Sequence, residues 1–136
     1  MVETSKAKRG RVMIVDDDPI TLEVTRERLE EAGYEVLVRD AALGTSAAVM
    51  RERPDFVLLD VNMPALGGEA LAKMLCGTSA GCGASVILYS GVDTKRLAQL
   101  AADCGALGAV QKTAQRAALP TAVRTLHRRI ARATGG

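Results

Sequence analysis

Short apolar runs along this chain alternate with longer segments in which apolar and polar residues are mixed. The runs predict five strands, at residues 11–16, 34–38, 56–59, 85–89 and 108–111. Nearly continuous apolar strands are typical of a parallel sheet that is covered on both faces. Because a segment with apolar residues at helical spacing follows each run, we expect strand and helix to alternate throughout an α/β fold.

The segments between the runs predict helices with one apolar face each. The first begins at Pro19, which suits a first helical turn, and ends at Gly33, a common C-terminal stop. Its expected inward residues are Leu22, Thr25, Leu29 and Ala32. A second helix is predicted at residues 42–52, with an apolar face made of Leu43, Ala47 and Met50. A later helix, capped by Asp93, should turn these residues inward: Leu97, Leu100, Ala101 and Cys104.

Length and composition indicate one small domain. The chain has 136 residues, 48% of them hydrophobic, which is enough for a core. We expect a loose polar arm at residues 1–10, the domain at residues 11–133, and no output domain after it. The net charge is only +2, which argues against binding a polyanion by bulk charge. No apolar run reaches the roughly 18 residues of a membrane span and no secretory signal is evident, so a soluble cytoplasmic protein is expected.

The cysteines and the single histidine are not expected to carry chemistry. Cys76, Cys82 and Cys104 are odd in number and irregular in spacing, which argues against a disulfide framework. We expect them to be small packing or loop residues and not metal ligands. His127 lies among arginines near the C-terminus, where an exposed helix position is expected.

Polar side chains with distinct chemistry follow four of the five predicted strands. They are Asp16, Asp17 and Asp18 at the end of the first strand, Asp60 at the end of the third, Ser90 at the end of the fourth and Lys112 at the end of the fifth. In an open α/β sheet, ligands bind beyond the carboxyl ends of the strands. Taken singly, each of these residues would be an ordinary turn or surface residue. Their shared position predicts one site that gathers carboxylates, a hydroxyl group and an ammonium group.

Carboxylates gathered in this way repel one another, and a divalent cation removes the conflict. Because the oxygen ligands have no histidine or cysteine beside them, they favour a hard ion. Mg²⁺ fits, with Mn²⁺ as the alternative. A cation, a lysine and a hydroxyl group together make a site for a dianion, for which a phosphoryl group is the natural occupant. An aspartate can also be the nucleophile, which gives an aspartyl phosphate.

Together these motifs resemble the receiver domain of two-component response regulators, the CheY-like family. The resemblance rests on VDDDP after the first strand, LLDVNMPALGG around Asp60, YSG at Ser90 and QK at Lys112. It covers nearly the whole chain, from residue 11 to residue 130. It implies a flavodoxin-like, doubly wound (βα)5 fold with a five-stranded parallel sheet in the strand order 2-1-3-4-5.

The resemblance also implies roles for the residues that match the family's motifs. Asp60 resembles the phospho-accepting aspartate, and Ser90 and Lys112 resemble the groups that contact the phosphoryl group. The residues that resemble metal ligands are Asp16, acting largely through water, Asp17, Asp60 and the backbone carbonyl of Asn62. Asp18 falls at a permissive family position, so we expect a helix-start residue that could be changed at little cost.

Two positions depart from the family's pattern in its usual readout region. This chain has Ala109 where the family usually has an aromatic residue, and Thr113 where it usually has a proline after the lysine. Tyr89, directly before Ser90, is the aromatic residue nearest to this region in the sequence. We expect activation to move the loop after Ser90 and the next helix without an aromatic swing.

The activity implied by the resemblance is self-catalysed transfer of a phosphoryl group to Asp60 from a sensor histidine kinase or phosphotransfer protein, followed by self-catalysed dephosphorylation. A last helix is predicted near the C-terminus, with Val123, Leu126 and Ile130 inward. A downstream protein is expected at the face of the helix after Asp93 (helix 4), the strand at residues 108–111 (strand 5) and this last helix (helix 5). Two alternatives stay open: a receiver-fold module whose partner binding does not depend on phosphorylation, and a receiver fragment of a larger regulator. Nucleic-acid binding is not favoured, because aromatic residues make up only 2% of the chain.

Overall fold

The computed structural model describes residues 10–41, 44–61, 85–91 and 94–111, together with Arg124, Thr125 and Arg128. Its elements are β1 (Gly10–Val15), α1 (Pro19–Glu31), β2 (Tyr34–Arg39), α2 (Thr45–Glu52), β3 (Phe56–Leu59), β4 (Ser85–Ser90), α4 (Thr94–Cys104) and β5 (Gly108–Gln111). All five predicted strands are present, and their bounds differ from the prediction by one residue at most.

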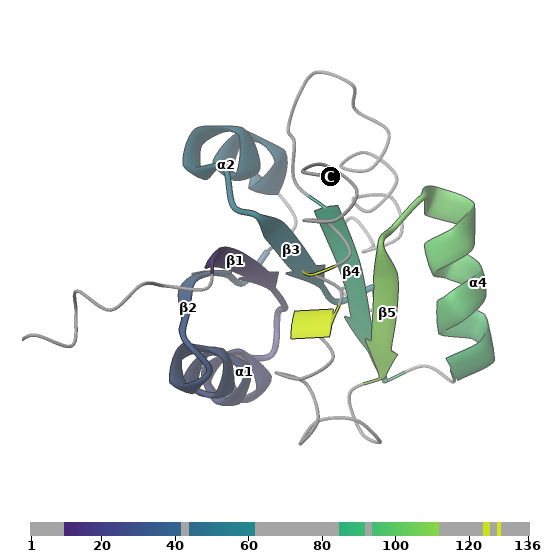
Figure 1. Cartoon of the computed structure of the whole chain (residues 1–136), viewed down its shortest axis with the longest axis horizontal. Helices are drawn as coiled ribbons and strands as arrows, with labels where there is room; N and C mark the ends of the chain where they lie inside the picture. Colours follow the sequence, from purple (N-terminus) through teal and green to yellow (C-terminus); the bar gives the residue numbers. More distant parts are fainter. Residues whose placement is uncertain are drawn as a thin grey trace, which may run out of the picture.

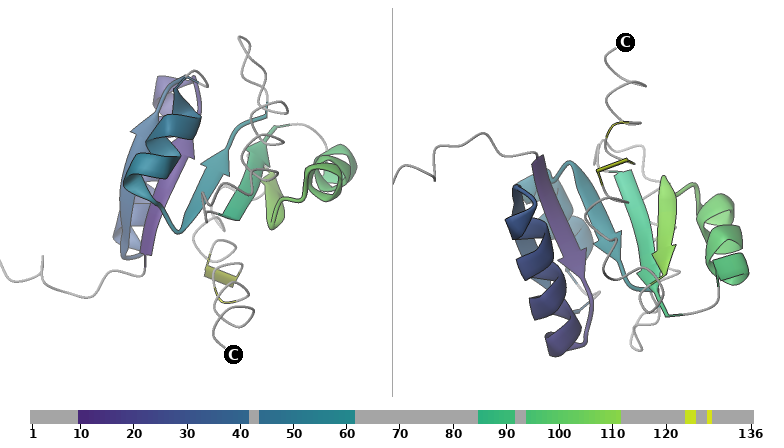
Figure 2. Two further views of the ribbon diagram at one scale, coloured as in Figure 1. Left: turned by 90° about the horizontal axis from the view of Figure 1, so that it is seen from above. Right: turned by 60° about the horizontal axis from the view of Figure 1, so that its bottom comes forward.

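The five strands form one parallel sheet in the order β2-β1-β3-β4-β5, which confirms the predicted doubly wound fold. β1 has a partner on each side, so Val15 is level with Arg39 of β2 and with Leu59 of β3. Figure 2 shows the strands running in one direction. Residues that follow different strands therefore gather at one edge of the sheet.

The sheet separates two hydrophobic cores. Because successive side chains of a strand point to opposite faces, Val12 and Ile14 pack on the side of α1, whereas Met13 and Val15 pack on the side of α2 and α4. Figure 1 shows α1 and α2 on opposite sides of the sheet. All four of these β1 side chains are buried, which explains why the strand is apolar at consecutive positions.

The inward face of α1 agrees with the prediction. Leu22, Thr25 and Leu29 are buried, and Ala32 packs partly buried at the end of the helix. Gly33 follows with a φ of 103°, a left-handed conformation that glycine adopts without strain. The helix therefore ends where the sequence places its stop.

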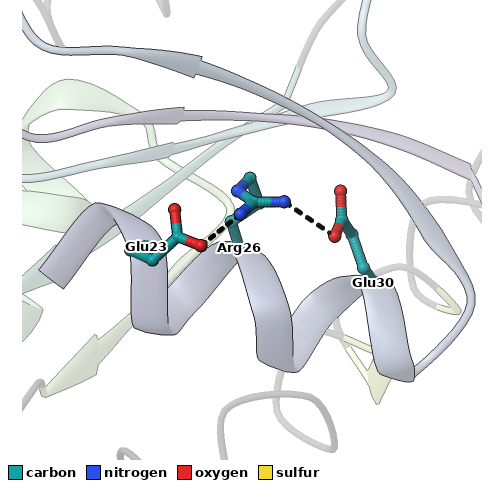
Figure 3. A network of polar contacts seen from close by, with 3 residues as sticks. All are labelled: Glu23, Arg26 and Glu30. Atoms are coloured by element: carbon teal, nitrogen blue, oxygen red, sulfur yellow. Dashed lines mark hydrogen bonds and ion pairs between the residues drawn. The ribbon is translucent and has the colours of Figure 1, made fainter. Parts of the chain in front are cut away.

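The outward face of α1 carries an ion-pair network, shown in Figure 3. Arg26 donates one hydrogen bond to Glu30, at 2.9 Å, and another to Glu23. The hydrogen bond and charge of Glu23, followed by the charge of Glu30, raise the pKa of Arg26 above its ordinary value. The network faces solvent, where such pairs contribute little to stability.

The helix predicted at residues 42–52 is present as α2, but its predicted apolar face is wrong. Ala47 is exposed and Met50 is 51% exposed, whereas the buried residues are Thr45, Ala48 and Val49. The physical reason is that the hydroxyl group of Thr45 is hydrogen-bonded within the fold, so this polar residue can turn inward and bring its neighbours on the same face with it.

The apolar face of α4 agrees with the prediction. Leu97 and Ala101 are buried, and Leu100 and Cys104 pack against the same core. Several other predicted positions lie outside the described residues: Leu43, the cap Asp93, the segment of residues 62–84 and residues 112–123 with the arm at residues 1–9. Of the last predicted helix, Arg124, Thr125 and Arg128 are described, and all three are helical.

Candidate functional site

The main chain at the end of β1 is held by hydrogen bonds from both neighbouring strands. The N–H group of Asp16 donates to the carbonyl oxygen of Arg39, the last residue of β2, at 3.1 Å. The N–H group of Asp60, directly after β3, donates to the carbonyl oxygen of Val15, at 2.9 Å. The sheet ladder thus continues past the last residues of the strands and fixes the backbones of Asp16 and Asp60 beside each other.

Three carboxylates meet at this edge of the sheet, as the sequence predicts. One carboxylate oxygen each from Asp16, Asp17 and Asp60 lies within 4.8 Å of the other two. Asp16 is completely buried and Asp60 is 4% exposed, whereas Asp17 is exposed. The cluster therefore has a buried base and one side open to water.

The backbone of Asp18 orients the carboxylate of Asp16. The N–H group of Asp18 donates to Oδ1 of Asp16, at 2.9 Å. The carboxylate of Asp18 itself turns toward α1, where it caps the helix by accepting from the N–H group of Ile20 at 3.3 Å and from the hydroxyl group of Thr21 at 2.5 Å. Asp18 starts the helix as predicted, but these two hydrogen bonds give its side chain a larger role than a replaceable turn residue has.

The residues at this edge fit a hard divalent cation. Like charges held this close, two of them away from water, are costly without a positive charge between them. Every ligand atom in the cluster is a carboxylate oxygen, and Mg²⁺ binds such oxygens together with water molecules that the open side at Asp17 can admit. Among the described residues, no nitrogen or sulfur ligand of the kind that zinc or copper favours joins the cluster.

Ser90 closes β4 at the same edge of the sheet. It is completely buried and level with Gln111, the last residue of β5. Lys112, the next residue of the chain, and Asn62 lie outside the described residues, as do Thr113, His127, Cys76 and Cys82. The site thus contains the three predicted carboxylates and lies on the side of the sheet where Ser90 ends its strand.

Tyr89 does not occupy the face of the sheet on which Ala109 lies. Tyr89 packs in the core on the side of α1, whereas Ala109 packs partly buried in the core on the side of α4. The register explains the difference, because Tyr89 is level with Val110, whose side chain points to the opposite face from Ala109. Tyr89 therefore cannot replace an aromatic residue at position 109 in this conformation.

Sequence reasoning did not find the residues that connect β2 to α2. Nε of Arg39 donates to the hydroxyl oxygen of Thr45 at 3.0 Å, and that hydroxyl group donates to the carbonyl oxygen of Ala41 at 2.8 Å. The available signal was a glycine, Gly44, directly before a threonine at a helix start. Cys104 is half-buried, and its thiol contacts the carbonyl oxygen of Ala101 at 3.9 Å, so it is a packing residue as predicted.

Across the described part of the chain, no helix has both the length and the apolar character needed to cross a lipid bilayer.

Known proteins with similar sequences include regulators and a sensor kinase. CseB, a transcriptional regulatory protein of Streptomyces coelicolor, is 31% identical over 130 residues, which are 96% of this chain and 54% of CseB. The sensor histidine kinase GacS of Pseudomonas protegens is 36% identical over 67 residues, which are 49% of this chain and 7% of GacS. The chain spans about half the length, or less, of the curated relatives that it matches.

A solved structure with the same fold is the BeF3-activated N-terminal receiver domain of RstA from Klebsiella pneumoniae. It has a TM-score of 0.77 and 27% identity, over 87% of this chain and 98% of that one. The family model described as the response regulator receiver domain matches residues 12–124. With this match over most of its length, and with the parallel sheet in the order 2-1-3-4-5, the chain belongs to the response regulator receiver domain family.

Proposed function

We propose that this domain accepts a phosphoryl group on Asp60 from a phosphohistidine of a sensor kinase or phosphotransfer protein, and signals by phosphorylation-dependent protein binding. The observation that carries the proposal is the cluster of Asp16, Asp17 and Asp60 at the carboxyl edge of the sheet, with a buried base and one open side. Similarity to a segment of the sensor histidine kinase GacS supports the choice of signalling system. The proposed domain covers residues 11–133.

In the proposed reaction, a carboxylate oxygen of Asp60 attacks the phosphorus atom. The phosphorus–nitrogen bond of the phosphohistidine breaks and a phosphorus–oxygen bond forms, while the imidazole leaves with the bonding electrons and takes up a proton. Because the phosphoryl transition state is loose, positioning of the nucleophile matters most. The hydrogen bond from the N–H group of Asp60 to Val15 would supply this positioning, since it ties the backbone of the nucleophile to the neighbouring strand β1.

Charge at the phosphoryl group would be balanced by groups from several strand ends. Asp16, Asp17 and Asp60, with the backbone carbonyl of Asn62, would hold Mg²⁺, which would neutralise the carboxylates and the phosphoryl oxygens. Lys112 would pair with a phosphoryl oxygen and Ser90 would donate a hydrogen bond to another. Attack by water on the phosphorus atom would later release inorganic phosphate and restore the Asp60 carboxylate, which the open side at Asp17 permits.

Intact-mass spectrometry after incubation with acetyl phosphate and Mg²⁺ tests the proposal. We expect one phosphoryl adduct in the wild type and in Asp103→Asn, an exposed aspartate on α4 that serves as the matched control. We expect none in Asp60→Asn, and none in the wild type when EDTA replaces Mg²⁺. An adduct that persists in Asp60→Asn would place the chemistry on another residue.

A second candidate is a receiver-fold module that binds its partner without phosphorylation. The observation that favours it is Ala109, which offers no aromatic side chain to couple the site to the α4 face. The absence of any adduct in the wild type would support this second function. Under the first function, BeF3⁻ with Mg²⁺ should instead change the amide chemical shifts of α4 and of the loop after Ser90, and an unchanged α4 would contradict it.

A further inference from the structure

The connection between β2 and α2 is held by a network that we call the Arg39–Thr45 latch. It consists of the 3.0 Å hydrogen bond from Nε of Arg39 to the hydroxyl oxygen of Thr45 and the 2.8 Å hydrogen bond from that hydroxyl group to the carbonyl oxygen of Ala41. Thr45 is completely buried, so these partners replace water for a group that would otherwise be costly to bury. The latch therefore joins the end of the strand to the start of the helix.

Gly44 is fitted to the latch in two ways. Its φ of 83° lies in the left-handed region, which disfavours any residue with a Cβ atom. A Cβ atom there would also lie 3.0 Å from Nη2 of Arg39. The guanidinium group thus packs closely against the glycine.

The latch connects to the carboxylate cluster through the backbone of Arg39. The carbonyl oxygen of Arg39 accepts the 3.1 Å hydrogen bond from the N–H group of Asp16. Within the described sheet β2 is an edge strand, paired with β1 alone, so no second strand holds the far side of Arg39. Its side-chain hydrogen bond to Thr45 adds a restraint on the residue whose carbonyl group Asp16 uses.

We infer that Arg39 and Thr45 are positioning residues that set the place of the Asp16 carboxylate and thereby the affinity of the cluster for Mg²⁺. The inference rests on the proposed function and adds two residues to it that touch neither the cation nor the phosphoryl group. Asp16 has its side chain oriented by the N–H group of Asp18 and its main chain by Arg39. Loosening the latch relaxes the second restraint and lets the carboxylate retreat from the cluster.

The test measures the dissociation constant of Mg²⁺ by isothermal titration calorimetry for Thr45→Val, Thr45→Ser and Arg39→Lys. Thr45→Val keeps the shape but removes the hydroxyl group, and Arg39→Lys keeps the charge but removes the Nε–H donor. We expect both to bind Mg²⁺ about fivefold more weakly, the factor that corresponds to one lost hydrogen bond of a positioned group. Thr45→Ser, which keeps the hydroxyl group, should restore wild-type affinity.

Two matched controls separate positioning from general stability. Arg51→Lys removes an Nε hydrogen bond on the exposed side of α2, to Glu52 at 3.2 Å, and Thr25→Val removes a buried hydroxyl group on α1. Both should bind Mg²⁺ as the wild type does, even if their melting temperatures fall. Wild-type affinity in Thr45→Val and Arg39→Lys would overturn the inference and leave the proposed function standing. A wild type that binds no Mg²⁺ would overturn both.

Discussion

Asp16→Asn tests two opposing effects of the buried carboxylate. Without a cation, it repels the neighbouring carboxylates; with one, it attracts the cation. The replacement has nearly the same shape, and its side-chain oxygen can still accept the hydrogen bond from the N–H group of Asp18. The change therefore removes one charge from a cluster whose carboxylate oxygens lie within 4.8 Å of one another.

The magnitude follows from the geometry. Two unit charges 4.8 Å apart repel by about 3.5 kcal/mol at an effective dielectric constant of about 20. Each charge is spread over two oxygens, and water reaches the cluster beside Asp17, so we expect about 2 kcal/mol of relief on removing the Asp16 charge. For a domain of this size that raises Tm by roughly 6 to 8 °C in the absence of divalent cations.

In the presence of Mg²⁺, the wild type should instead melt at a higher temperature than Asp16→Asn. At a concentration about 100 times its dissociation constant, Mg²⁺ stabilises the wild type by about 2.7 kcal/mol, and the variant should gain much less. Calorimetric melting with EDTA and with Mg²⁺ measures both effects, and Asp103→Asn, which changes an exposed carboxylate, is the control. A variant that melts below the wild type in EDTA would refute the repulsion argument, and an unchanged response to Mg²⁺ would refute the assignment of Asp16 as a ligand.

Three further predictions concern stability away from the cation. Asp18→Ala should cost about 1 kcal/mol in urea unfolding through loss of the helix cap, and Asp18→Asn should recover most of it; equal stability of the two variants would contradict the capping role. Leu97→Ala should lower the free energy of unfolding by about 2 to 5 kcal/mol in the same assay, because the Leu97 side chain on the inner face of α4 is only 1% exposed. A smaller loss would mean that the core closes around the vacated space. Arg26→Gln should lower Tm slightly at low ionic strength and not at about 1 M salt, where the Debye length is about 3 Å. Since the pKa of Arg26 is raised, the contribution of its ion pairs is present below the ordinary arginine pKa and is lost only as pH rises through the higher folded value, so mildly alkaline buffer should leave the Arg26→Gln difference unchanged.

The strands and the carboxylate cluster could be predicted because local pattern decides them. Burial on both faces makes each strand apolar at consecutive positions. The end of each apolar run therefore shows that Asp16 and Asp60 come at the ends of their strands. Parallel strands then bring these residues to one edge. Strand order is different, since it depends on pairing between distant segments, and the resemblance to a family supplied it.

The predictions that were wrong or incomplete involve contacts that no local pattern encodes. The face of α2 was misplaced because a polar residue, Thr45, turns inward to meet Arg39 from another element. The structural role of Asp18 was underestimated, because its capping of α1 and its hydrogen bond to Asp16 depend on the geometry of the turn. The sequence also did not show on which face of the sheet Tyr89 lies. Its strand neighbour is Val110, so Tyr89 packs in the opposite core from Ala109.

Because Asp16 and Asp60 directly follow β1 and β3, the carboxylate cluster is attached to strands that open more rarely than β5 does. The amides of Asp16 and Asp60 close the ladders of β1 and β3, two of the three strands that have neighbours on both sides within the described sheet. Such strands exchange hydrogen with solvent only when the whole fold opens. β5, which carries Ala109, pairs with β4 alone within the described sheet and can open at a lower free energy. A rearrangement on the β5 and α4 side can therefore occur many times while the carboxylate cluster stays intact.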